Sequence, residues 1–121
     1  MSEKTNSRPY DLEERTFLFA KEVRLFVRKL PVSTSNIEDG KQVIRSSGSV
    51  GANYIEANEA LSKKDFLMRV KISRKEAKES AYFLRLLKEM NAPEFVGDAD
   101  TLVNEAIELK KILSAIIEKS K

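Results

Sequence analysis

Basic side chains that could contact a polyanion recur along residues 62–90. This stretch holds nine basic and four acidic residues, whereas residues 91–121 hold four basic and six acidic ones, so the net charge of +3 conceals an uneven distribution. At the period of a helix, residues spaced seven apart share a face. The candidate nucleic-acid-binding residues on that face are Lys64, Lys71, Arg74, Lys75, Lys78, Tyr82 and Arg85. Their charges could contact phosphates of RNA or DNA while Tyr82 stacks on a base; the alternative is an ordinary solvated helix face.

One acidic residue of the same stretch falls on its apolar side. Glu76 lies between Ile72 and Phe83 on a helical wheel, where a carboxylate is costly unless it is paired or hydrogen-bonded. Its candidate partners on the preceding helix are Arg45, Asn53 and Asn58. We interpret the residue as part of a buried polar pin that fixes helix register or a subunit contact. The candidate members of the pin are Asn53, Glu56 and Glu76. The alternative is that Glu76 serves as a catalytic acid or base.

The residue types that most enzymes depend on are missing. The chain contains no histidine and no cysteine, which removes the commonest general base, thiolate metal sites and disulfides. The segment Gly48-Ser49-Val50-Gly51 lacks the spacing and the following lysine of a phosphate-binding loop. We therefore predict no catalytic residue, no metal, no cofactor and no small-molecule substrate, and hence a protein that is not an enzyme.

The hydropathy pattern predicts a cytoplasmic protein without a membrane partner. No apolar run approaches the roughly 20 residues that a membrane-spanning helix needs. Residues 1–8 are polar and lack the apolar core of a signal peptide.

Four helical segments must position these residues, and start and stop signals separate them. Capping boxes are expected at Asp11/Glu14, Ser35/Glu38 and Ser62/Asp65. The predicted helices begin at Asp11, near Ser35, at Ser62 and near Asp98, and they end before Pro31 and near Ala60, Met90 and Lys119. The links between them are short, which makes consecutive helices antiparallel. The sequence thus predicts an all-α, up-down-up-down antiparallel four-helix bundle over residues 11–121, after a flexible N-terminal tail at residues 1–10.

Apolar residues exceed what one bundle core requires. The first and last segments each carry a single stripe, Phe19, Val23, Phe26 and Leu30 in one and Leu102, Ala106, Leu109, Leu113 and Ile116 in the other. The second segment carries two lines about 100° apart. We assign Ile37, Ile44, Gly48, Gly51 and Ile55 to the core, with the glycines allowing close helix approach, and the second line to an outer surface. The candidate oligomer-interface residues are Val43, Val50, Tyr54, Leu61, Ile72 and Phe83. Another copy of the chain is the simplest partner; the alternative is one wide core face.

Two blocks of the sequence resemble a known family. Residues 44–57 resemble the signature of the small bacterial "four helix bundle protein" family, whose founding members are encoded in 23S rRNA intervening sequences. The matching positions are Ser49, Val50, Asn53, Tyr54 and Glu56, while Ile55 and Ala57 depart from the pattern. Residues 65–67 and 71–87 resemble its second block, and the resemblance covers about residues 12–118. It implies an antiparallel four-helix bundle, a ring-shaped homopentamer and no catalytic residues. A distant relative is the accessory variability determinant of diversity-generating retroelements, whose basic surface contacts nucleic acid and a reverse transcriptase.

Two hypotheses of function follow from the residues and the resemblance together. The first is a non-enzymatic homo-oligomeric module that binds RNA or another nucleic acid through the basic face of the third segment. The second is an oligomeric scaffold for a protein partner, with no role in nucleic-acid binding. Salt-sensitive binding to RNA would distinguish the first from the second.

Overall fold

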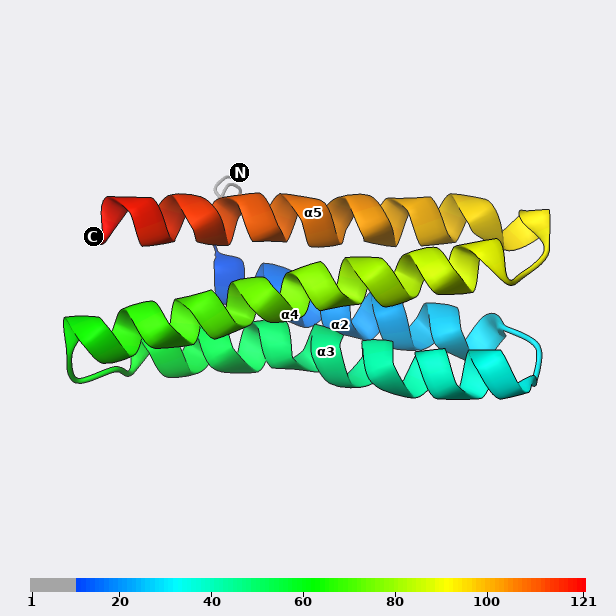
Figure 1. Cartoon of the computed structure of the whole chain (residues 1–121), viewed down its shortest axis with the longest axis horizontal. Coiled ribbons are helices and arrows are strands. Elements are labelled where there is room, and N and C mark those ends of the chain that lie inside the picture. Colours follow the sequence, from blue (N-terminus) through cyan, green and yellow to red (C-terminus); the bar gives the residue numbers. More distant parts are fainter. Residues whose placement is uncertain (1–10) are drawn as a thin grey trace, which may run out of the picture.

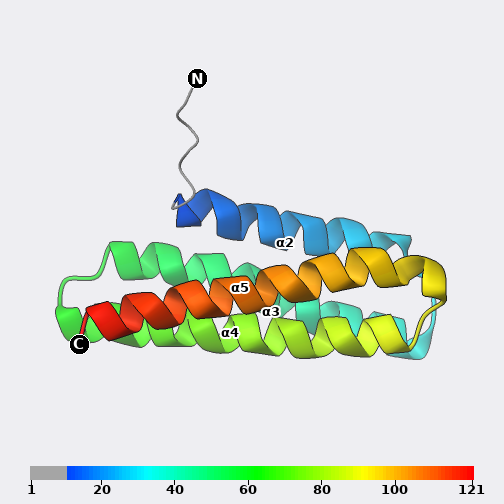
Figure 2. The same ribbon diagram turned by 90° about the horizontal axis from the view of Figure 1, so that it is seen from above.

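Four long helices lie side by side in a computed structural model that describes residues 11–121. They are α2 (Leu12–Lys29), α3 (Thr34–Asn58), α4 (Lys63–Glu89) and α5 (Val96–Lys119), with a 3₁₀ turn, η1 (Pro93–Phe95), before α5. The α2–α3 and α4–α5 links lie at one end and the α3–α4 link at the other (Figures 1 and 2), so consecutive helices run antiparallel. The predicted up-down-up-down four-helix bundle is confirmed. The predicted tail at residues 1–10 lies outside the described residues.

Side-chain caps begin three of the helices. The Asp11 carboxylate accepts from the Glu14 backbone N–H at 3.2 Å, and the Ser62 hydroxyl accepts from that of Asp65 at 3.0 Å, which confirms both N-caps. The reciprocal bonds of the predicted capping boxes, from the backbone N–H groups of Asp11 and Ser62 to the side chains of Glu14 and Asp65, do not form within residues 11–121. Helix α3 begins earlier than predicted, because Ser33 rather than Ser35 caps it by accepting from Asn36 N–H at 3.1 Å. Helix α5 also begins two residues before Asp98, since the 3₁₀ turn opened by Pro93 leads directly into it.

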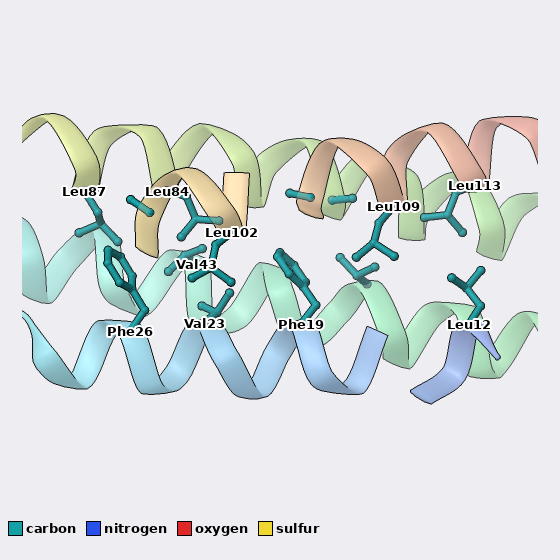
Figure 3. Close-up of a cluster of buried hydrophobic side chains, with 14 of the residues drawn as sticks. Leu12, Phe19, Val23, Phe26, Val43, Leu84, Leu87, Leu102, Leu109 and Leu113 are labelled. Carbon is teal, nitrogen blue, oxygen red and sulfur yellow. The ribbon is translucent and has the colours of Figure 1, made fainter. Parts of the chain in front are cut away.

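One apolar stripe from each helix fills the centre of the bundle (Figure 3). The stripes predicted for the first and last helices are buried, from Phe19 to Phe26 in α2 with Leu30 at its C-cap, and from Leu102 to Leu113 in α5. At the end of α5, Ile117 is fully buried, although the sequence pattern placed Ile116 in the core. Ile116 is only partly buried and packs against the edge of the core. A single stripe per helix is the pattern that periodicity identifies best.

The assignment of the two apolar lines of α3 was wrong. Val43 and Val50 are fully buried in the core, whereas Ile37 and Ile55 are 46% and 43% exposed. The glycine line instead faces α2. A Cβ atom on Gly51 would lie 2.8 Å from the Thr16 hydroxyl oxygen, so the predicted close helix approach is present. Because glycine contributes no side chain, that line makes a helix contact without forming the core.

The burial of α3 also corrects the predicted oligomer interface. Val43 and Val50 lie inside the bundle and are not available to a second copy. Tyr54 and Phe83 are partly buried against the core, Ile72 is half-buried, and Leu61 is fully exposed in the α3–α4 link. The interface role of these four residues stays a prediction.

Candidate nucleic-acid interface

Helix α4 presents the predicted basic residues on its outer side. The side chains of Lys64, Lys71, Lys75, Lys78 and Arg85 are exposed, Arg74 is half-buried, and Tyr82 is 57% exposed. Twenty-one helical positions separate the first and last of these residues, which corresponds to about 31 Å. The opposite side of the helix enters the core through Val70, Ala77 and Leu84. The hydrophobic stripe thus fixes the direction in which the basic face points.

Small polar residues hold α4 closely against α3. The Ser73 hydroxyl donates to the Val50 backbone carbonyl at 2.7 Å, and the hydroxyls of Ser46 and Ser80 are 2.8 Å apart. All three serines are fully buried, so their hydrogen bonds satisfy groups that would otherwise be costly in the core. These contacts make α4 a rigid support for the basic face.

The acidic residues of α4 nearest to the core pair with α3 rather than with the basic face. Arg45 contacts the Glu76 carboxylate at 3.3 Å and also pairs with Glu79. Partial desolvation lowers the pKa of Arg45, but the charges of the two glutamates outweigh it and raise the pKa above its ordinary value. Both carboxylates are thereby directed toward one arginine of the neighbouring helix.

The cations of the basic face have no acidic partners among the described residues. Within residues 11–121, none of its six cations forms an ion pair. By contrast, Lys88, which lies toward α5, pairs with Asp100 at 2.8 Å. A row of cations without carboxylate partners is available to bind phosphates, which would otherwise have to displace those partners.

The three predicted members of the polar pin lie in different environments. Glu76 is 7% exposed and lies beside Arg45, one of its three candidate partners. Asn53 is half-buried, donates to the Ser49 carbonyl at 2.9 Å and accepts from Arg69 at 3.2 Å. Glu56 is exposed on the outer face of α3, so its predicted burial is wrong. Its place in the sequence pattern did not reveal that this position of α3 faces outward, although the next residue, Ala57, is buried.

Two residues of α5 extend the basic face, and sequence reasoning missed both. A groove of about 400 Å³ between the helices is lined by Lys71, Arg74, Lys75, Lys78, Lys110 and Ser114. The Arg74 guanidinium donates to the Ser114 hydroxyl at 3.4 Å, which joins the two helices across the groove. Lys110 was not predicted because it lies in the segment in which acidic residues outnumber basic ones. Only the packing of α5 beside α4 brings it to the basic face.

A separate apolar groove of about 680 Å³ lies between α2 and α3. Three large exposed side chains line it: Phe17 at 61%, Leu25 at 40% and Ile55 at 43% exposure. Gly48 and Gly51 also line the groove, and Lys21, Arg24 and Arg28 add positive charge. Surplus apolar surface therefore exists on the α2–α3 side, away from Val43 and Val50. A second apolar hollow lies on α4, where Leu67, Met68 and the predicted interface residue Ile72 line it among lysines.

Comparison with known proteins identifies the family. A family model described as 23S rRNA-intervening sequence protein matches residues 10–115. The chain belongs to this family. A crystal structure of a protein with unknown function from the S23 ribosomal protein family of Bacteroides thetaiotaomicron is 31% identical to it, with a TM-score of 0.72. The match covers 88% of this chain and 97% of that one. A search of the curated proteins found no match.

The described helices carry neither a membrane-spanning segment nor an acidic metal-binding cluster. Among residues 11–121, no helix combines the length and the apolar character that crossing a membrane requires. The same residues contain no group of three or more acidic side chains placed to hold a metal ion.

Proposed function

We propose that this member of the 23S rRNA-intervening sequence protein family is a non-enzymatic module that binds RNA or another nucleic acid through α4. The observation that carries the proposal is the row of six cations on the outer face of this helix, none of which is ion-paired within residues 11–121. A row of positive charges along one helix complements the regular negative charge of a phosphate backbone.

Phosphate contacts explain what such a surface can and cannot recognise. Lysine and arginine side chains on phosphates position a nucleic acid and supply affinity, but they read no base sequence. Tyr82 lies among these cations, one helical turn from Lys78, and more than half of its surface is exposed. Its ring, which packs edge-on against Phe83, can stack on an unpaired base. We therefore expect the protein to bind nucleic acid with little sequence preference and to accept single-stranded segments.

Charge reversal with a matched control tests this proposal. Binding of a fluorescently labelled, structured ribosomal RNA fragment is measured by anisotropy for the wild type and for a Lys71→Glu/Lys75→Glu/Lys78→Glu variant. The control is Lys41→Glu/Lys111→Glu/Lys121→Glu, which changes the net charge by the same amount at exposed lysines on α3, α5 and the C-terminus. We expect the α4 variant to bind at least tenfold more weakly than the control, with helicity unchanged. Equal binding by the two variants would show that only net charge matters and would refute the proposal.

A second proposal concerns self-association. The α2–α3 groove gathers Phe17, Leu25 and Ile55 on one surface, and clustered apolar side chains of this size are uncommon on a monomer. We propose that a second copy of the chain covers this groove, in place of the interface that Val43 and Val50 were predicted to form. The homo-oligomeric form implied by the family resemblance would then rest on α2 and α3.

Light scattering coupled to size-exclusion chromatography tests the second proposal. We expect the wild type to be oligomeric at tens of micromolar protein and a Phe17→Asp/Ile55→Asp variant to be smaller. Val32→Asp is the control, because Val32 is 90% exposed in the α2–α3 link and does not line the groove. A monomeric wild type, or equal dissociation by Val32→Asp, would refute it.

A further inference from the structure

We infer that the groove between α4 and α5 seats a phosphate of the bound nucleic acid, so that the backbone crosses from α4 onto α5 instead of following α4 alone. This inference rests on the proposed function and specifies its site. Five cations and one hydroxyl line the groove, and no acidic residue does. The five cations come from two helices, so a ligand held by all of them must touch both.

Arg74 is the residue best prepared to hold the phosphate. It is half-buried, and one guanidinium nitrogen lies 3.4 Å from the Ser114 hydroxyl of the neighbouring helix, a long hydrogen bond that orients the side chain toward the groove. A guanidinium presents several N–H donors in one plane and matches the paired oxygens of a phosphate. A half-buried side chain that already points toward the groove loses less conformational entropy when the ligand arrives than a fully exposed one.

Two adjacent lysines of α5 differ in their position relative to the groove. Lys110 lines the groove and has no ion pair within residues 11–121. Lys111 is exposed, lies outside the groove and pairs with Glu108 at 3.7 Å. Consecutive helical residues point about 100° apart, so one side chain reaches the basic face while its neighbour does not.

The surroundings of the groove favour a polymer over a free anion. Lys64 and Arg85 continue the positive row beyond Lys71 and Lys78 by seven residues on either side, or about 10 Å. A single phosphate ion would leave these outer cations unused, whereas a chain of linked phosphates can contact the groove and the row together. The chemistry thus points to the backbone of a polynucleotide.

Single charge reversals at the two α5 lysines test the inference. In the anisotropy assay with labelled ribosomal RNA, we expect Lys110→Glu to weaken binding about as much as Lys78→Glu, by roughly tenfold, and Lys111→Glu to change it less than threefold. Arg74→Lys keeps the charge but loses the planar fork, and we expect it to weaken binding severalfold. Circular dichroism checks that each variant keeps the wild-type helicity.

The outcomes separate the inference from the function on which it rests. If Lys78→Glu weakens binding but Lys110→Glu resembles Lys111→Glu, the phosphates follow α4 alone and the inference is overturned while the proposed function stands. If the wild type does not bind RNA, both fail. Inorganic polyphosphate should displace the RNA, whereas inorganic phosphate at the same concentration of phosphorus should not. Displacement by inorganic phosphate would mark a site for the free ion and would also overturn the inference.

Discussion

Substituting alanine for Gly51 tests the close packing of α2 on α3. An added Cβ would lie 2.8 Å from the Thr16 hydroxyl oxygen and 3.2 Å from the Thr16 Cβ. The hydroxyl cannot turn away freely, because it donates to the backbone carbonyls of Leu12 and Glu13 at 2.9 and 3.0 Å. The Thr16 Cβ is attached directly to the α2 backbone. The added methyl group therefore has to push the two helices apart.

Two opposing free energies set the magnitude of the effect. Replacing glycine by alanine in a helix interior favours the folded state by about 1 kcal/mol. Forcing an extra methyl group into a closely packed contact costs about 1–3 kcal/mol. We therefore expect the Gly51→Ala variant to be less stable than the wild type, by up to about 2 kcal/mol.

Urea unfolding followed by circular dichroism, at one fixed protein concentration, measures this difference. Gly97→Ala is the matched control, since an added Cβ there meets no atom within 4 Å. We expect the control to unfold at the same or a slightly higher urea concentration. If Gly51→Ala were as stable as Gly97→Ala, the two helices could not approach as closely at Thr16 as the structure indicates.

Three further experiments test the core and its polar contacts. Leu109→Ala, at a fully buried position of α5, should cost about 2–5 kcal/mol of unfolding free energy in the same urea assay. Asn36 and Asn91 exchange two amide hydrogen bonds of 2.8 Å, so Asn36→Ala should cost about 1–3 kcal/mol and show coupling to Asn91→Ala in a double-mutant cycle. Arg45→Met should destabilise the fold by leaving the buried Glu76 without its ion pair, and adding Glu76→Met should recover most of the loss. If the effects of Arg45→Met and Glu76→Met on the unfolding free energy were additive, the pairing of the two side chains would be contradicted.

Sequence patterns predicted the helices well where a local signal decides the outcome. Asp11 and Ser62 cap their helices as expected, because a capping side chain acts on a backbone N–H only three residues away. The core stripe of α2 was also predicted, because this helix has one apolar line that its periodicity identifies. These features depend on residues close together in the chain.

The misassigned features depend on which helices become neighbours. In α3, the two apolar lines were equally consistent with the helical period, and only the position of α2 decides that Gly51 meets Thr16 while Val43 enters the core. Glu56 was misplaced for the same reason. At the candidate site, the α4 residues followed from their spacing, but Lys110 joins them through the packing of α5. No pattern within residues 62–90 contains that information.

The salt dependence of RNA binding tests the central claim most directly. If about six cations of α4 contact phosphates, the logarithm of the binding constant should fall linearly with the logarithm of salt concentration, with a slope of about −4 to −5. The Lys71→Glu/Lys75→Glu/Lys78→Glu variant should lose about two to three units of that slope. A wild-type slope near zero, or the same slope for the wild type and the variant, would contradict binding of phosphates by this face of α4.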